Sequence, residues 1–414
     1  MLKRSMINKN GVINLVVLLT IILNVYGAAL SRMYNLPTIV FTAIPLVLLF
    51  MCLCIFNKGL LQVDSNKKGL LYINLFVFIC HMLLCGFGSN EIKYFLYFIV
   101  FLVVNSLVSK QNWKIVEIAL VGIGVFLSLD ALQYLPDLIS RGVRIYNVAN
   151  STILDKSVYT LVLTLAFICL LVNYLDKNLI NTARIVSLVL MVFFGAINIV
   201  LIQSKLFILV LAATIFVLYF FTNGTPKKFV RSFSLVAVLL IVVAFVFYPQ
   251  IIPDYIYVFL NRYLGVFGDA VSSITAYDRY TTTYSMRGTV YDFAFDLFLN
   301  HPLFGVGFGN YKNYAIENAG LLGGVTQTES SMMNVLVEGG AIYFVTHLAL
   351  LLLLLQRIIR VKKKDPENLL YTKLLVILIA YVILNTGNDF YNVLYWLILG
   401  YIYKLTKESK VINI

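Results

Sequence analysis

The sequence predicts an all-α, polytopic membrane protein with about twelve transmembrane helices and a long outer-face loop that contains short amphipathic helices. Two observations carry this prediction. Of the 414 residues, 61% are hydrophobic and only 12% are charged, about half the charged fraction of an ordinary soluble domain. The apolar residues also fall in runs of about 17–25, the length that crosses a hydrocarbon core of about 30 Å.

The expected spans cover most of the chain, so residues 1–414 are interpreted as a single integral membrane domain. No internal repeat or low-complexity tract divides it. Two longer polar stretches are expected as outer loops, a smaller one at 136–156 and a large one at 249–330. The spans are expected at 11–30, 36–56, 70–88, 92–108, 115–135, 157–175, 183–202, 206–222, 232–248, 331–355, 369–385 and 388–403.

Lysine and arginine counts in the connecting segments predict the orientation. If the N-terminus is cytoplasmic, twelve spans return the C-terminus to the same side, and the inner segments then hold 22 of the 32 basic residues. We therefore expect both termini in the cytoplasm. The net charge of +13 is explained by this topology. Because the basic residues are scattered over many short loops, no basic face for nucleic acid is expected.

The cysteines and histidines show no metal-binding pattern. All five cysteines fall inside expected spans, where apolar packing explains them. His81, His301 and His347 are far apart in the sequence and have no zinc-ligand spacing. Nucleotide-binding motifs are also missing, so the sequence predicts neither a metal nor a cofactor.

The outer segments differ from the inner ones in the kind of basic residue. They hold six arginines and four lysines, whereas the inner segments hold five arginines and 17 lysines. A guanidinium group matches two phosphate oxygens at once, so a specific anionic ligand is one explanation. Simple pairing with nearby aspartates is the alternative. The outer arginines are Arg32, Arg141, Arg144, Arg262, Arg279 and Arg287.

Asp130 is an acidic residue inside an expected span. Asp130 is about five residues from the outer end of 115–135, and a charge at that depth is a functional hypothesis by default. Asp130 either lines a cavity that faces Arg141 and Arg144 or pairs with one of them.

The middle of the large loop predicts a short amphipathic helix over 286–300. Val290, Phe293 and Leu297 fall on one face of it, and we expect it to lie along the membrane surface. Pro302 ends the helix, and glycines then alternate over 305–309. Alternate glycines permit a tight turn or a close approach to phosphate. A structural turn is the favoured interpretation.

Two stretches resemble a known family. They are SMRGTVYDFAFDLFLNHPLFGVGFGNY at 285–311 and TESSMMNVLVEGGAIY at 328–343. Both are similar to the signature region of the bacterial O-antigen polymerase and O-antigen ligase superfamily. Many relatives, the ligases above all, carry a His eleven residues before a Gly-x-x-Gly/Tyr turn. Counting back from Gly340 places Glu329 at that position in this chain.

The resemblance implies a membrane glycosyltransferase at the outer face of the bacterial inner (plasma) membrane. Its substrate would be an undecaprenyl-pyrophosphate-linked oligosaccharide, and no nucleotide sugar would be needed. The favoured hypothesis is a polymerase that joins repeat units into O-antigen or capsular polysaccharide. A ligase that transfers finished polymer is the runner-up, and a flippase or other transporter is the alternative from another class. A chain-length regulator and a flippase are possible protein partners by analogy.

The resemblance also assigns roles to residues. Glu329 is the candidate general base that takes the proton of the attacking hydroxyl, and Arg287 is the candidate for stabilising the pyrophosphate leaving group. Glu329 lies in a plausible helix-capping segment as well, and the two roles are compatible. The expected substrate-binding residues are Arg141, Arg144, Arg279, Lys205, Asn150 and Asn310.

Overall fold

The computed structural model describes most of the chain, and within its helices some side chains are left out. The described residues are 9–35, 38–57, 68–85, 89–136, 156–202, 204–221, 275–322, 325, 328, 330–386 and 392–406. All regular structure in these ranges is helical, which confirms the all-α prediction for this part of the chain. The expected span at 232–248 lies outside the described residues, as does most of the 136–156 loop.

Fourteen helical elements follow one another along the described chain. They are α1 (Lys9–Tyr34), α2 (Thr38–Asn57), α3 (Lys68–Cys85), α4 (Ser89–Leu107), α5 (Lys110–Leu132), α8 (Lys156–Leu175), α9 (Asn181–Ala196), the π-helix η2 (Ile197–Leu201), α10 (Lys205–Phe221), α13 (Thr275–Asn300), α14 (Tyr311–Glu317), α15 (Ser331–Lys364), α16 (Leu369–Leu384) and α17 (Val393–Leu405).

The apolar helices agree with the expected spans. Among the described helices, five are long and apolar enough to cross a membrane: Lys9–Gly27, Lys110–Leu132, Ser157–Leu175, Asn181–Leu201 and Ser331–Lys364. Six shorter apolar segments lie at Ala43–Asn57, Tyr72–Leu84, Ile92–Leu107, Leu206–Leu218, Leu369–Leu384 and Val393–Leu405. The protein is therefore a polytopic membrane protein, and the total of twelve spans stays a prediction.

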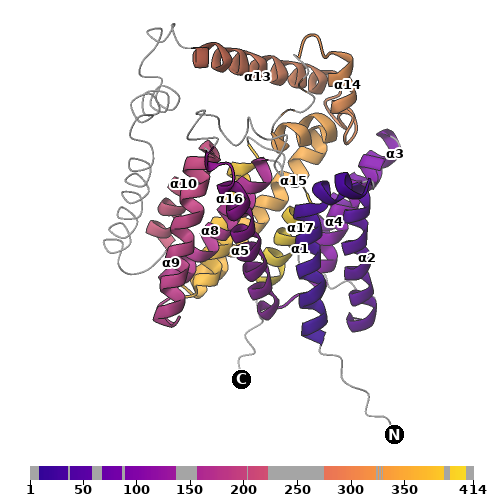
Figure 1. Cartoon of the computed structure of the whole chain (residues 1–414). Coiled ribbons are helices and arrows are strands. Elements are labelled where there is room, and N and C mark those ends of the chain that lie inside the picture. Colours follow the sequence, from indigo (N-terminus) through magenta and orange to yellow (C-terminus); the bar gives the residue numbers. More distant parts are fainter. Residues whose placement is uncertain are drawn as a thin grey trace.

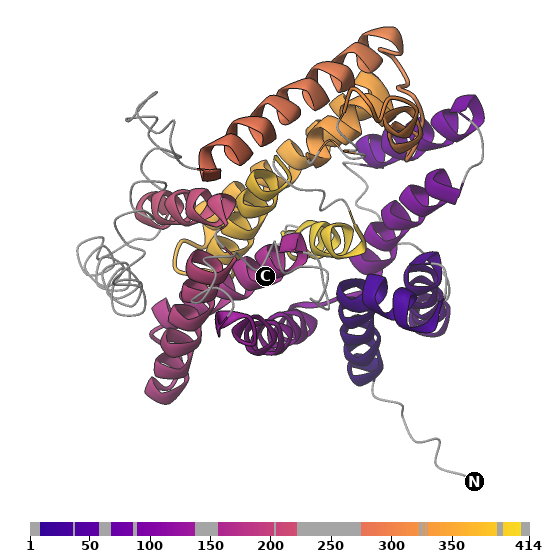
Figure 2. The ribbon, with the colours of Figure 1, turned by 45° about the horizontal axis from the view of Figure 1, so that its top comes forward.

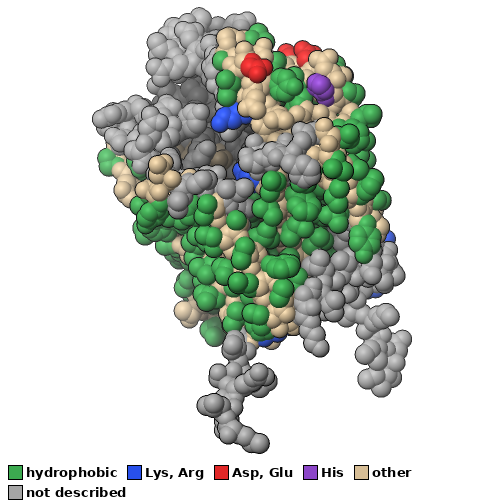
Figure 3. All heavy atoms as spheres, turned by 90° about the vertical axis from the view of Figure 1, so that its right-hand side faces the viewer, with side chains coloured by type: hydrophobic (Ala, Val, Ile, Leu, Met, Phe, Trp, Pro, Cys, Tyr) green, Lys and Arg blue, Asp and Glu red, His purple; other side chains and the backbone are tan. Residues whose placement is uncertain are grey.

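The helices form one bundle with a separate layer across one end. Figure 1 shows α13 and α14 lying over the bundle where α15 begins, and Figure 2 shows α13 running alongside α15. We call this end of the bundle the α13 end and the opposite one the far end. Hydrophobic side chains cover the side of the bundle in Figure 3, whereas the acidic side chains visible there gather at the α13 end. Such a belt suits contact with lipid.

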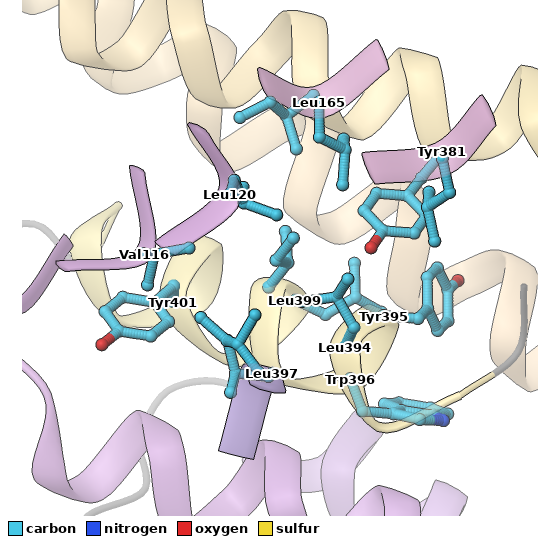
Figure 4. Close-up of a cluster of buried hydrophobic side chains, with 14 of the residues drawn as sticks. Val116, Leu120, Leu165, Tyr381, Leu394, Tyr395, Trp396, Leu397, Leu399 and Tyr401 are labelled. Carbon is cyan, nitrogen blue, oxygen red and sulfur yellow. The ribbon is translucent and has the colours of Figure 1, made fainter. Parts of the chain in front are cut away.

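The short helix α17 occupies the centre of the bundle. Nearly all of its residues are buried, including Trp396 and Tyr401, and its side chains point outward in several directions toward Val116 and Leu120 of α5, Leu165 of α8 and other neighbours (Figure 4). A helix that is apolar on every side belongs in a protein interior. This central position explains why the last expected span is shorter than a lipid-exposed one.

A buried ion pair connects three helices near the far end. Nζ of Lys373 in α16 lies 2.6 Å from Oε1 of Glu117 in α5 and donates to Oδ1 of Asn173 in α8 at 2.9 Å. Both charged side chains are largely removed from solvent. The two charges and the amide bind one another, so the carboxylate near this end of α5 has its counter-charge within the bundle.

Candidate functional site

A small second core forms the layer at the α13 end. Val290, Ala294 and Leu297 of α13 are buried against Tyr311 of α14 and Val337 of α15. The predicted amphipathic helix therefore exists, with the predicted face buried. The helix begins at Thr275 and is therefore longer than expected. Its buried face packs on other parts of the protein.

The glycine-rich turn that follows α13 is hydrogen-bonded to the backbone of α15. The N–H groups of Val306 and Gly307 donate to the carbonyl oxygens of Val337 and Glu338, both at 3.0 Å. Those two N–H groups are consequently not available to a phosphate. This finding supports the structural interpretation of the turn over a phosphate loop.

Gly340 breaks α15 at the place where the turn docks. Its φ of 69° and ψ of 179° lie outside the helical region, so the span expected as one helix from 331 consists of two segments. The kink leaves the preceding carbonyls free to accept from the turn. A Cβ on Gly340 would lie 2.4 Å from the Leu303 carbonyl oxygen, and one on Gly305 would lie 2.4 Å from that of Glu338. Only glycine fits at either position.

One aromatic side chain of the turn inserts into the bundle. The ring of Phe308 is buried and stacks on Tyr94 of α4 with centroids 4.7 Å apart, and it also contacts Tyr343 of α15 at 5.0 Å. The imidazole of His81 lies 4.3 Å from the same ring and donates from Nε2 to the Glu338 carbonyl oxygen at 2.9 Å. Phe308 and His81 thus fix the turn and the kink to α3 and α4.

One carboxylate at this kink, Glu338, was not among the predicted site residues. Glu338 is only 5% exposed. Together with burial, its charge raises the pKa of Tyr311 to about 12, burial being the larger cause, so the Tyr311 hydroxyl stays protonated at neutral pH. An available signal was overlooked, since Glu338 is an acidic residue inside an expected span.

The start of α15 is capped as the sequence suggested, by the residue after Glu329. The Ser330 hydroxyl accepts from the Met333 N–H at 3.4 Å, and the Thr328 hydroxyl donates to Oδ1 of Asn334 at 2.7 Å. Both capping residues are buried. Glu329 itself lies outside the described residues, so its role as a base stays a prediction.

The structure describes only some of the other predicted site residues. Arg279 and Arg287 lie in α13, which contacts α15, and Lys205 begins α10; the side chains of all three are left out. Asn310 is described: its Nδ2 donates to the Val306 carbonyl at 3.0 Å, and its Oδ1 accepts from Asn313 at 3.4 Å. Both bonds belong to the turn. Arg141, Arg144 and Asn150 lie outside the described residues.

Asp130 lies at the α13 end of α5 and is bonded across to the next helix. The Tyr159 hydroxyl of α8 donates to Oδ2 of Asp130, and Nε2 of Gln133 donates to Oδ1 at 3.4 Å. Within the part of the chain that the structure describes, no lysine or arginine forms an ion pair with Asp130. The expected pairing with Arg141 or Arg144 concerns residues outside that part.

Taken together, the bundle and its loop layer define a membrane protein whose loop helices are docked on a kinked helix at one end. Residues 189–348 match the family described as O-antigen ligase (Wzy_C), so this stretch is a domain of that family and the resemblance is confirmed. It runs from α9 into α15 and includes the turn and the kink. The family implies a membrane enzyme that acts on lipid-linked glycans. No curated protein matches the chain.

Proposed function

We propose that this protein is a polymerase that joins undecaprenyl-pyrophosphate-linked oligosaccharide repeat units into a surface polysaccharide, O-antigen or capsule. The family domain at 189–348 carries this proposal, together with Glu329 at the position where ligase relatives have a His. The α13 end then faces the outside of the plasma membrane, and both termini lie in the cytoplasm. The lysine-rich far side supports this orientation.

The proposed reaction forms one bond and breaks another at the same carbon. A hydroxyl of the acceptor sugar attacks the anomeric carbon of the donor, and the bond from that carbon to the pyrophosphate oxygen breaks. The electron pair leaves with the pyrophosphate, while Glu329 takes the hydroxyl proton. Arg287 is assigned to the growing phosphate charge. Further contacts to the substrate are assigned to Arg279, Arg144, Arg141, Lys205, Asn150 and Asn310.

The docked turn supports this assignment by its rigidity. Catalytic groups must be held in place by surrounding structure, and the proposed ones lie on either side of the turn. Arg287 belongs to α13 and Glu329 precedes α15, while Phe308 and the two glycine contacts connect these helices to the bundle. The turn therefore acts as the frame of the proposed site.

Conservative substitution tests the arginine role. Arg287→Lys keeps the charge but loses the two-pronged geometry that matches phosphate. We expect polymer yield to fall at least tenfold in membranes that contain normal amounts of the variant. Full activity of Arg287→Lys would exclude bidentate phosphate binding by this residue.

A ligase is the second candidate, favoured by the description of the matching family. It would transfer finished polymer onto a lipid core. A deletion strain distinguishes the candidates when its lipid-linked intermediates are assigned to leaflets. The polymerase predicts single repeat units in the outer leaflet, whereas the ligase predicts long polymer that is not attached to core. Accumulation in the inner leaflet would identify a flippase and overturn both.

A further inference from the structure

We propose that Asp130 and Tyr159 form a binding site for a sugar hydroxyl of the lipid-linked substrate, at the α13 end of α5 and α8. This inference rests on the proposed function, because the sugar belongs to the substrate assigned there. It adds a second place of substrate contact, on helices that precede the family domain in the sequence.

The bonding of Asp130 is the first observation. The carboxylate is 5% exposed and accepts hydrogen bonds from only two described side chains, Tyr159 and Gln133. An ionised carboxylate has about four lone-pair directions, so it accommodates further donors. No described cation pairs with Asp130, and a buried carboxylate in that state is costly, so a ligand that donates hydrogen bonds would reduce the cost.

Gln133 is the group that an incoming ligand would displace from Asp130. Its side chain is exposed, and its bond to Oδ1 of Asp130 is 3.4 Å long, which is weak for an N–H to oxygen bond. An incoming hydroxyl can replace this amide at Oδ1 while the amide turns to solvent. Tyr159 remains on Oδ2 and keeps the carboxylate in position.

A second buried polar group lies in the neighbouring π-helix. Asn198 of η2 is 0% exposed, and both its amide nitrogen and its amide oxygen are without a hydrogen-bond partner within the described part of the chain. The Ser128 hydroxyl of α5 is buried and unpartnered in the same sense. A π-helix inside a longer helix is often found at a functional site.

Helical register places Asn198 close to the level of Asp130 along the bundle. A Cβ on Gly124 of α5 would meet the ring of Phe194 at 3.0 Å, so these two residues mark one level of the α5–α9 contact. Ser128 and Asn198 each follow four residues later, about one turn toward the α13 end. Because η2 contacts both α5 and α8, Asn198 borders the two helices that carry Asp130 and Tyr159, whereas Ser128, two residues from Asp130, points to a different face of α5.

The chemistry of these groups selects the ligand. Asp130, Tyr159 and Asn198 offer one carboxylate, one phenol and one amide, and none of the three carries a positive charge. A pyrophosphate would be repelled by Asp130, whereas a neutral hydroxyl can donate to the carboxylate and accept from the amide. The site therefore suits the sugar part of the substrate, and the phosphates are left to the arginines.

The test compares two lipids that differ only in the sugar. Purified protein in nanodiscs is titrated with the repeat-unit lipid extracted from the deletion strain and, separately, with undecaprenyl pyrophosphate. The substitutions Tyr159→Phe, Asp130→Asn and Asn198→Leu should each weaken binding of the sugar-bearing lipid about tenfold. Binding of the sugar-free lipid should stay unchanged.

Tyr401→Phe is the control, because it also removes a buried tyrosine hydroxyl, but one near the far end for which the described part of the chain shows no hydrogen-bond partner. It should alter neither affinity. Equal losses for both lipids in the three variants, or no loss for either, would overturn the inference and leave the proposed function standing. If the unsubstituted protein bound neither lipid, the proposed function would fail and the inference with it.

Discussion

Helix α5 carries a buried carboxylate near each of its ends, and their surroundings differ. Near the far end, Glu117 pairs with Lys373 at 2.6 Å, and Asn173 completes the group. At the α13 end, Asp130 has the hydroxyl of Tyr159 and a long bond from Gln133. The first group is complete without a ligand. Counting the described side chains alone, the second group has hydrogen-bonding capacity left, at the end of the bundle where the glycine-rich turn lies.

This difference suggests a division of labour within the bundle. The ion pair connects α5, α8 and α16, and the central helix α17 contacts α16. The α13 end gathers features that a closed membrane core does not require: a π-helix, a kinked span, a docked turn and two buried carboxylates. Such departures from regular structure are typical of functional sites.

The largest effect is expected at the ion pair. Glu117→Gln leaves Lys373 buried without its counter-charge, and breaking a buried pair in this way costs about 3–5 kcal/mol. We expect a large fall in the thermal midpoint of the detergent-solubilised protein. The double variant Glu117→Gln/Lys373→Met should recover much of it, because no buried charge is left. A single variant as stable as the unmodified protein would show that the pair is not structural.

A smaller loss of stability and a larger loss of function are expected at the kink. Gly340→Ala forces a non-glycine residue to φ 69° and places its Cβ 2.4 Å from the Leu303 carbonyl, for a strain of about 1–3 kcal/mol or more. Undocking of the turn should lower polymer yield at least tenfold while the bundle stays folded. Gly288→Ala in α13 is the control, since its Cβ meets open space. Normal polymer from Gly340→Ala would contradict the framing role of the turn.

The smallest effect on stability is expected at Asp130. Asp130→Asn keeps the size of the side chain and leaves no described lysine or arginine without a counter-charge. It should therefore change the free energy of unfolding by only about 0.5–1.5 kcal/mol. The thermal midpoint checks this beside that of Glu117→Gln. Similar destabilisation by the two variants would remove the contrast between the ends of α5.

The sequence was sufficient for features that depend on local composition. Hydropathy located the apolar helices, and the spacing of Val290 and Leu297 predicted the buried face of α13. Alternate glycines correctly favoured a structural turn. The family resemblance was carried by two stretches of the sequence, 285–311 and 328–343, and the family match covers both.

Other features depend on contacts between distant segments, and the sequence did not reveal them. The kink at Gly340 arises because the turn supplies hydrogen bonds from more than thirty residues earlier in the chain, through Val306 and Gly307. His81 looked like an isolated histidine until its bond to the Glu338 carbonyl placed it at the site. Glu117 and Lys373 are also distant in sequence, and hydropathy says nothing about which charges meet.

Polymerisation by the purified protein tests the central claim most directly. The protein in nanodiscs is incubated with the extracted repeat-unit lipid, and the products are resolved by length. The unmodified protein should produce a ladder of multiple repeats and release undecaprenyl pyrophosphate. Glu329→Gln should slow ladder formation by about 10²–10⁴-fold, the usual contribution of a general base. A full ladder from Glu329→Gln would contradict the assigned base, and no ladder from the unmodified protein would contradict the polymerase itself.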